Sequence, residues 1–354
     1  MSVSPFDHPL LSGLLGDAEV AACFSLEAEL AEMLAFERAL ARAEAEEGLI
    51  PTQAADAIEG SLAAFAPDMA GLRGGAARDG VIVPELVRQM RAAVGEPHGR
   101  HLHFGATSQD VVDTGLALRL QRATGILSAR LGHVIAALGA LDARDGQLEV
   151  MAHTRMQAAI PVTASRRVRA WRDPLVRHRE RLDAVMKDVG LVSFGGAAGT
   201  LDKLGDKGRS VAGRIATLLG LGAPDHARHS ERDGVVAFAS WLSMVSGSLG
   251  KLGQDVALAA QSEVGEVKLA GGGGSSAMPH KVNPIGAETL VALARFNATL
   301  ASGMHHALVH ENERSGAAWT LEWMLLPQMT VATAAGLGTA LRLIDGLEFV
   351  RPSE

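Results

Sequence analysis

Apolar residues recur at helical spacing along most of this chain. Between Leu116 and Leu141 they are separated by three or four residues, with arginines on the opposite face. From Val235 to Ala259 the spacing alternates strictly between three and four, which is the heptad pattern of helices that pack nearly parallel. These two segments predict long helices of a bundle.

Three further segments extend this helical pattern. Apolar positions from Leu290 to Leu308 indicate another bundle helix, and residues 165–189 indicate a fourth. The uncharged run from Trp323 to Leu341 is long enough to cross a bilayer, but Pro327 and Gln328 interrupt it. We therefore interpret this run as a buried helix pair.

The N-terminal third carries shorter periodic segments. An amphipathic helix is predicted to begin near Leu26 and to stop at Gly48. Over residues 51–100 we expect short helices that break at Pro67, Gly71, Gly74, Gly75, Pro84 and Pro97.

Together these patterns predict an all-α fold. We expect a small N-terminal helical domain over residues 1–105, a central bundle of long helices over residues 106–345, and a short tail over residues 346–354. Heptad seams of long bundles commonly continue across subunits, so we also predict a homo-oligomer.

Composition narrows the class of protein. The chain has 354 residues, of which 47% are hydrophobic and 21% charged, so it is not a disordered protein. Its net charge of −7 argues against general binding to nucleic acid or to a membrane surface. Cys23 is the single cysteine, which excludes an intramolecular disulfide and fits a reducing cytoplasm.

The candidate chemistry centres on a loop. Residues 271–274 are four glycines, and the following Ser-Ser-Ala-Met-Pro-His-Lys-Val-Asn-Pro sequence ends at Pro284. A glycine-serine linker would explain the glycines, but it needs neither the prolines nor the polar residues between them. The pattern is typical of an active-site lid with a hinge and a rigid polar edge.

Three other polar clusters accompany this loop. Residues 101–110 lead into the first long helix, where Thr107 and Ser108 can cap it and offer amides to an anion. Residues 153–157 precede another helix, and residues 194–200 form a second glycine-rich loop.

A metal site is not predicted. His306 and His310 lie four residues apart, a spacing that suits zinc on a helix, but no third ligand and no metalloprotease pattern accompany them. No cofactor is expected.

In their order and spacing, the four clusters resemble the fumarase/aspartase superfamily over nearly the whole chain. Within it, several stretches are most similar to bacterial 3-carboxy-cis,cis-muconate cycloisomerases. These stretches are residues 103–110, 177–181, 194–200, 263–266 and 311–319.

The resemblance implies a mainly helical homotetramer, with each active site built from three subunits. It implies a cytoplasmic enzyme of aromatic degradation (the β-ketoadipate pathway), which closes 3-carboxy-cis,cis-muconate to a lactone without a cofactor. Members of this superfamily usually continue into a further helical domain after the bundle, and we expect that domain to be largely absent from this chain.

Roles for individual residues follow from the same resemblance. Ser275 is the loop serine that transfers the proton, with Ser276 as the alternative, and Lys281 and Asn283 hold a substrate carboxylate. The other substrate-binding positions implied are His103, Thr107, Ser108, Gln157, Thr200, Met278 and Arg314.

Arg155 departs from the family pattern. Most superfamily lyases have a catalytic histidine here, paired with a glutamate that corresponds to Glu288, and cycloisomerases usually have tryptophan. Arginine is no base, but it can bind a carboxylate or pair with Glu288. A lactonising enzyme needs no base for its nucleophile, because the nucleophile is the substrate's own carboxylate. Arg155 therefore favours a cycloisomerase over an adenylosuccinate-type C–N lyase.

Three alternatives stay open from the sequence. One is the C–N lyase, one is a cycloisomerase that prefers a 3-sulfo analogue, and one is a non-enzymatic structural oligomer of helices. The complete set of Ser275, Lys281 and Asn283 argues against the last of these.

Overall fold

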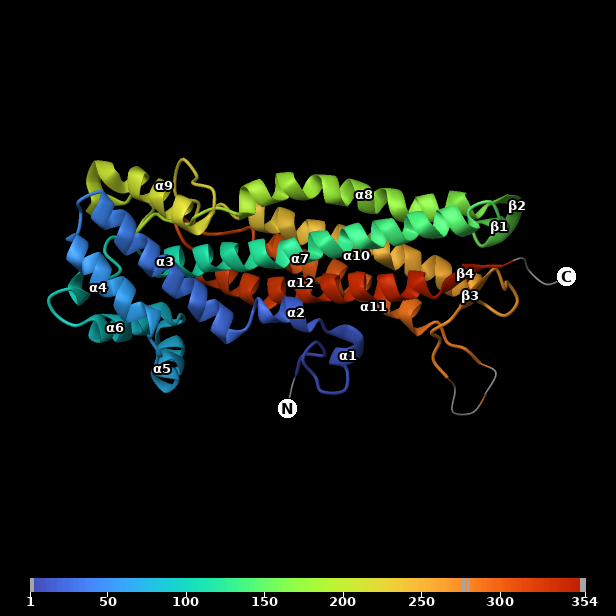
Figure 1. The fold of residues 1–354 in the computed structure, drawn as a ribbon, viewed down its shortest axis with the longest axis horizontal. Helices are drawn as coiled ribbons and strands as arrows, with labels where there is room; N and C mark the ends of the chain where they lie inside the picture. Colours follow the sequence, from blue (N-terminus) through green and yellow to red (C-terminus); the bar gives the residue numbers. More distant parts are fainter. Residues whose placement is uncertain (1–2, 275–277, 279–280, 351–354) are drawn as a thin grey trace.

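The computed structural model describes residues 3–274, 278 and 281–350. The molecule is elongated and mostly helical (Figure 1). Within the described residues, five long helices run along it, namely α7 (Ser108–Asp145), α8 (Ala164–Val189), α10 (Asp233–Ala259), α11 (Ile285–His306) and α12 (Gly316–Asp345). The predicted bundle of long helices is therefore present.

The heptad positions of α10 form the centre of the bundle core. Phe238, Leu242 and Val245 are all fully buried. Glycines let α11 come close to α10: a Cβ added at Gly250 would lie 2.5 Å from the Ala294 side chain, and one at Gly253 would lie 2.4 Å from a backbone oxygen. Small residues on this face of α10 are thus required for the close packing.

A second core lies at the end of the molecule where α7 begins. It is built from α3 (Leu26–Glu46), α4 (Thr52–Ala63), α5 (Met69–Asp79), α6 (Val83–Val94) and α9 (Gly208–Leu219) (Figure 1). The short helices α1 (Ser12–Leu15) and α2 (Ala18–Ala22) lie instead along the bundle, and Val20 and Cys23 belong to its core. The 3₁₀ turns η1 (Gly99–His101) and η2 (Asp202–Lys207) precede the long helix α7 and the helix α9.

Two small antiparallel sheets lie at the opposite end of the bundle (Figure 1). Strands β1 (Glu149–Thr154) and β2 (Gln157–Thr163) form a hairpin after α7, with a register shift between Met151 and His153. Strands β3 (Val267–Leu269) and β4 (Leu347–Phe349) pair near the last turn of α7. The described chain is therefore mainly rather than purely helical.

Several predicted boundaries differ from the structure. Gly71, Gly74 and Gly75 do not break the chain but lie inside α5, where a Cβ at Gly75 would meet Glu85 at 2.6 Å. Gly71 and Gly75 allow close packing of α5 on α6, whereas a Cβ at Gly74 would meet nothing within 4 Å. Pro84 lies in the first turn of α6, a position that proline tolerates.

The C-terminal part also differs from the prediction. Residues 316–345 form one continuous helix that passes through Pro327, not a helix pair. Helix α11 ends at His306, so His310 does not share a helical face with it. Residues 347–349 form strand β4, so the predicted tail includes a strand. The division into domains at residue 105 stays a prediction.

By length and composition alone, α7, α10 and α12 are apolar enough to cross a membrane. In this structure α12 packs against both α7 and α10, and each of the three also contacts α8 or α11. Helix packing buries part of the apolar surface of each helix, and the buried share is smallest for α7.

Candidate active site

The first turn of α7 organises one end of the molecule. Thr107 is the N-cap, with extended backbone, and its N–H donates to Asp110 Oδ2 at 2.9 Å. Ser108 is the first helical residue. An acidic side chain in this turn is also favoured by the positive end of the helix dipole.

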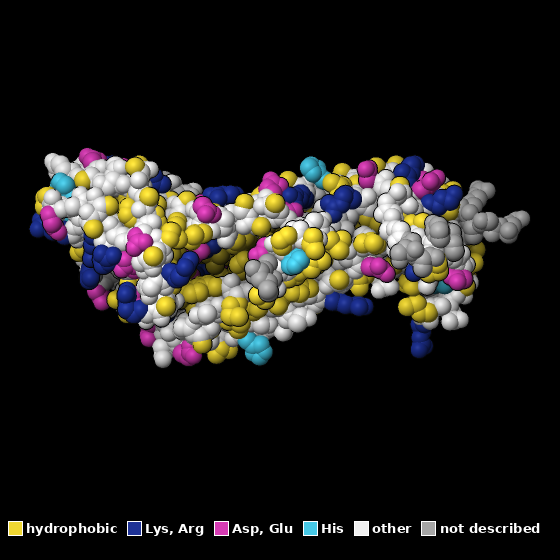
Figure 2. Space-filling model, turned by 90° about the horizontal axis from the view of Figure 1, so that it is seen from below, with side chains coloured by type: hydrophobic (Ala, Val, Ile, Leu, Met, Phe, Trp, Pro, Cys, Tyr) yellow, Lys and Arg dark blue, Asp and Glu magenta, His cyan; other side chains and the backbone are white. Residues whose placement is uncertain are grey.

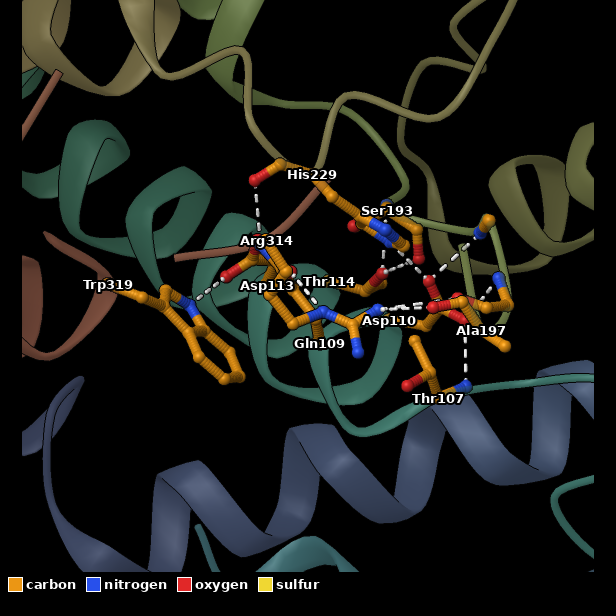
Figure 3. A network of polar contacts seen from close by, with 12 residues as sticks. Thr107, Gln109, Asp110, Asp113, Thr114, Ser193, Ala197, His229, Arg314 and Trp319 are labelled. Carbon is orange, nitrogen blue, oxygen red and sulfur yellow. Dashed lines mark hydrogen bonds and ion pairs between the residues drawn. The ribbon is translucent and has the colours of Figure 1, made fainter. Parts of the chain in front are cut away.

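Asp110 ties this turn to the glycine-rich loop between α8 and α9 (Figure 3). The N–H of Gly195 donates to Oδ1 at 2.9 Å, and the N–H of Gly196 donates to Oδ2 at 3.0 Å. His229 Nε2 lies 2.7 Å from Oδ1. Because Asp110 is fully buried, these contacts take the place of water around its carboxylate.

The loop needs glycine where it crosses the segment before α7. Gly196 has a φ of +68°, and a Cβ there would lie 2.7 Å from the carbonyl oxygen of Gly105. A residue with a side chain at this position would be strained by the left-handed backbone and would also clash with that carbonyl oxygen. Thr200, a predicted binding residue, is exposed a few positions further along this loop.

Arg314 reaches this cluster from the connection between α11 and α12. Its Nε donates to Gln109 Oε1 at 2.9 Å, and its Nη2 lies 3.3 Å from the carbonyl oxygen of Ala197. The amide of Gln109 has one orientation, because its Nε2 donates to Asp113 Oδ2 at 3.0 Å and to the His229 carbonyl at 2.8 Å. Gln109 therefore fixes the direction in which Arg314 points (Figure 3).

A buried charge cluster lies behind Gln109. Arg232 Nη1 donates to Asp113 Oδ2 at 2.7 Å, and the same guanidinium pairs with Glu322 of α12. Asp113 also accepts a hydrogen bond of 2.8 Å from Trp319 Nε1. Burial alone would lower the pKa of Arg232, but Asp113 and Glu322 raise it above its ordinary value. Arg232 therefore stays charged.

His103 lies just before α7 and contacts α3. Its Nδ1 is 2.5 Å from Glu37 Oε1, and the residue has a φ of +61°. Burial acts to lower the pKa of His103, but the charge of Glu37 and its hydrogen bond raise that pKa above the ordinary histidine value.

Arg155 and Gln157 lie at the far end of the bundle, at the turn of the β1–β2 hairpin. Both are exposed, and Arg155 and Met156 have φ values of +48° and +65°, as in a type I′ turn. Such turns favour Asn and Gly, so this one holds a strained backbone. Among the described residues Arg155 forms no ion pair, so the suggested contact with Glu288 is not made within one chain.

The signature loop lies at this far end too. Its described part is closed by backbone pairing of Gly273 with Asn283, with both N···O distances 2.9 Å. Lys281 and Met278 are exposed, and Glu288 is exposed in the first turn of α11. Ser275 and Ser276 lie outside the described residues.

The predicted site residues thus form two groups at opposite ends of the bundle. Helix α7 has 38 residues, so its ends are roughly 55 Å apart at ~1.5 Å per residue. His103, Thr107, Ser108, Thr200 and Arg314 lie near its start. Arg155, Gln157, Met278, Lys281, Asn283 and Glu288 lie toward the other end. A single subunit does not bring the two groups together.

Comparison with known proteins identifies the family. The model of the Lyase family matches residues 18–296. The chain belongs to this family. This confirms the resemblance to the fumarase/aspartase superfamily that the motifs indicated.

Several relatives of this lyase are enzymes with a named activity. The 3-carboxy-cis,cis-muconate cycloisomerase of Pseudomonas aeruginosa is 40% identical over 94% of this chain and 73% of the relative. That of Bradyrhizobium diazoefficiens is 38% identical over 96% of this chain and 77% of the relative. The crystal structure of the 3-carboxy-cis,cis-muconate lactonizing enzyme from Pseudomonas putida has a TM-score of 0.90 at 37% identity, covering 96% of this chain and 77% of that one.

The sequence alone did not single out the residues that support the site. Glu37, Asp113, His229, Arg232 and Glu322 are buried polar residues far apart along the chain. The available signal was a charged residue at an otherwise apolar helical position, as at Asp113 between Val112 and Leu116.

Proposed function

We propose that this lyase is a cycloisomerase that closes 3-carboxy-cis,cis-muconate to 4-carboxymuconolactone. The observation that carries the proposal is the relationship to enzymes of that activity, at up to 40% identity over nearly the whole chain. The cluster around α7 supports it, because the helix N-terminus, the Arg314 guanidinium and the His103 imidazole suit a polycarboxylate.

The reaction is an internal addition that conserves all atoms. An oxygen of one substrate carboxylate forms a C–O bond to an alkene carbon, and the π electrons move into the conjugated carboxylate to give an aci-carboxylate. Ser275 then supplies a proton to the carbon next to that group and is reprotonated from solvent. The extra negative charge is held by Lys281 and Asn283.

A complete site on this scheme needs more than one chain. The two groups of proposed site residues are separated by most of the length of α7, so we infer a homotetramer with shared sites. Exposed apolar side chains support the inference: Met156 and Ile160 on the hairpin are 73% and 64% exposed. Figure 2 shows further apolar side chains along the middle of one face.

Substrate turnover tests the activity directly. Purified protein is expected to remove the ultraviolet absorbance of 3-carboxymuconate, and Ser275→Ala is expected to abolish this while the mass from light scattering stays that of a tetramer. Absence of turnover by the unchanged protein would contradict the proposed activity. Full activity of Ser275→Ala would contradict the role of Ser275 as proton donor. A parallel assay with the 3-sulfo analogue, with and without Arg155→Trp, tests whether Arg155 sets the accepted substituent.

The cellular setting follows from the same proposal. A soluble enzyme of aromatic degradation would act in the cytoplasm on a small polycarboxylate, with neither nucleic acid nor membrane as a partner.

A further inference from the structure

Glu37 is a buried carboxylate that the proposed chemistry does not use. It lies on α3 with 1% of its surface exposed, and among the described residues its one polar side-chain contact is from Oε1 to His103 Nδ1 at 2.5 Å. Its other oxygen, Oε2, has no hydrogen-bond partner among the described residues. Burying such a group is costly unless it pairs with a cation, so the contact with His103 dominates its environment.

The second nitrogen of His103 is directed elsewhere. Among the described residues the one side-chain hydrogen bond of His103 is that of Nδ1 with Glu37, and the side chain keeps 13% exposure. The residue stands four positions before Thr107, and the following Gly105 packs directly on Gly196 of the glycine-rich loop. Glu37 of α3 therefore holds Nδ1, and Nε2 has no partner among the described residues next to the first turn of α7.

We propose that Glu37 is a positioning residue, which fixes the ring of His103 so that Nε2–H donates to an oxygen of the bound polycarboxylate. This inference rests on the proposed function. It adds to the site a residue of α3 that acts through His103 and does not itself bind the substrate.

The charges around His103 make the proposal specific. Glu37 raises the pKa of His103 most, Asp110 of α7 raises it further, and Arg91 of α6 lowers it. Burial is the largest single influence on this pKa and lowers it, so the charge and the hydrogen bond of Glu37 are what hold the pKa above the ordinary histidine value. Glu37→Gln is therefore expected to lower the pKa of His103, so that the imidazole loses its proton at a lower pH than in the unchanged protein.

Glu44 supplies a matched control. It lies two helical turns beyond Glu37 on α3 and is equally buried, and burial together with the Glu37 charge raises its pKa to about 9. Glu44 is thus uncharged near pH 7.5, so Glu44→Gln removes no charge there. Glu37→Gln is a change of the same size that removes one.

Deuterium exchange at the imidazole C2 position, followed by mass spectrometry, reports the protonation of one histidine in the full assembly. His101 lies close by in sequence, so all variants carry His101→Gln. We expect the midpoint for His103 to fall by at least about one pH unit in Glu37→Gln and to stay unchanged in Glu44→Gln. An unchanged midpoint in Glu37→Gln would overturn the proposal, as would equal shifts in the two variants.

Steady-state kinetics then separate positioning from a merely structural role. At a pH between the two measured His103 midpoints, Glu37→Gln is expected to raise KM about tenfold, the effect of one charge-assisted hydrogen bond, with kcat changed less than about twofold. At a pH below both midpoints its KM should return toward that of the unchanged protein. A KM increase that is the same at both pH values would contradict the proposal.

Failure of the proposed function has a different signature. If the unchanged protein does not turn over 3-carboxymuconate, the same comparison is made by calorimetry with tricarballylate, a plain tricarboxylate. Weaker binding to Glu37→Gln at a pH between the two His103 midpoints, but not at a pH below both, would support the role of Glu37. If Glu37→Gln and the unchanged protein bind tricarballylate equally at both pH values, this role of Glu37 is rejected.

Discussion

Replacing Arg232 by methionine tests how the buried charge cluster supports the fold. Arg232 is only 5% exposed, and its two carboxylate partners, Asp113 and Glu322, are 7% and 0% exposed. Methionine keeps an unbranched apolar chain but removes the cation. Two carboxylates would then face each other inside the protein without compensation, unless one of them takes up a proton.

The size of the effect follows from this burial. Breaking a buried ion pair by removing one partner costs about 3–5 kcal/mol. For 354 residues, an unfolding entropy of about 2.1 cal/mol/K per residue gives about 0.74 kcal/mol/K. Arg232→Met is therefore expected to lower Tm by about 4–7 °C at equal protomer concentration.

Thermal unfolding followed by circular dichroism measures this change. The matched control is Arg209→Met, because the Arg209–Asp225 pair is 78% and 94% exposed and is expected to shift Tm by less than about 1 °C. Adding Glu322→Leu to Arg232→Met should recover part of the loss, since one uncompensated charge is removed. A shift in Arg232→Met no larger than in the control would refute the reasoning.

Three further predictions concern single positions. Asp110→Asn should lower kcat/KM at least about tenfold, because an amide nitrogen cannot accept hydrogen bonds from the N–H groups that the carboxylate holds, and the mass of the assembly should stay unchanged. Gly196→Ala should lower Tm because of its positive φ and the Gly105 contact, whereas Gly213→Ala, in open space within α9, should raise it slightly. For Glu44 the folded pKa of about 9 exceeds the ordinary 4.5, so stability falls as pH rises between these values. Glu44→Gln should therefore raise Tm more near pH 8 than near pH 5, and an equal change at both would contradict this.

Periodic patterns predicted the long helices because their cause is local to each segment. The alternating spacing from Val235 to Ala259 leaves one apolar face, and α10 (Asp233–Ala259) buries that face whichever helices surround it. Its partners also follow simple rules, since neighbouring small residues allow the close contact with α11. For such segments the sequence contains the whole physical argument.

Glycine and proline gave the weakest predictions because each has two structural uses. Gly75 was interpreted as a helix break, yet its missing side chain makes room for Glu85. Pro327 was interpreted as a boundary, yet α12 continues through it because the surrounding core buries the helix on both sides of that position. The choice between these uses depends on a neighbour that the local pattern does not reveal.

The supporting polar network could not be predicted for a related reason. Arg232 lies 119 positions from Asp113 and 90 from Glu322, so only the folded chain brings the three together. The motif residues around Thr107 and Arg314 were recognised by family resemblance, and the structure places them in one cluster. Ser275 and Ser276 lie outside the described residues, so their roles stay predictions.

The burial of Asp110 resolves an apparent conflict in this site. A carboxylate in the first turn of α7 stabilises the helix, but it would also repel an anion that approaches the same helix end. Here its oxygens accept hydrogen bonds from Thr107, Gly195 and Gly196 and face His229, so its charge is taken up inside the protein. The Arg314 guanidinium, by contrast, reaches the surface of the cluster. An incoming polycarboxylate therefore meets the helix amides and Arg314 first, which is why the same residue can stabilise the fold without opposing the proposed binding.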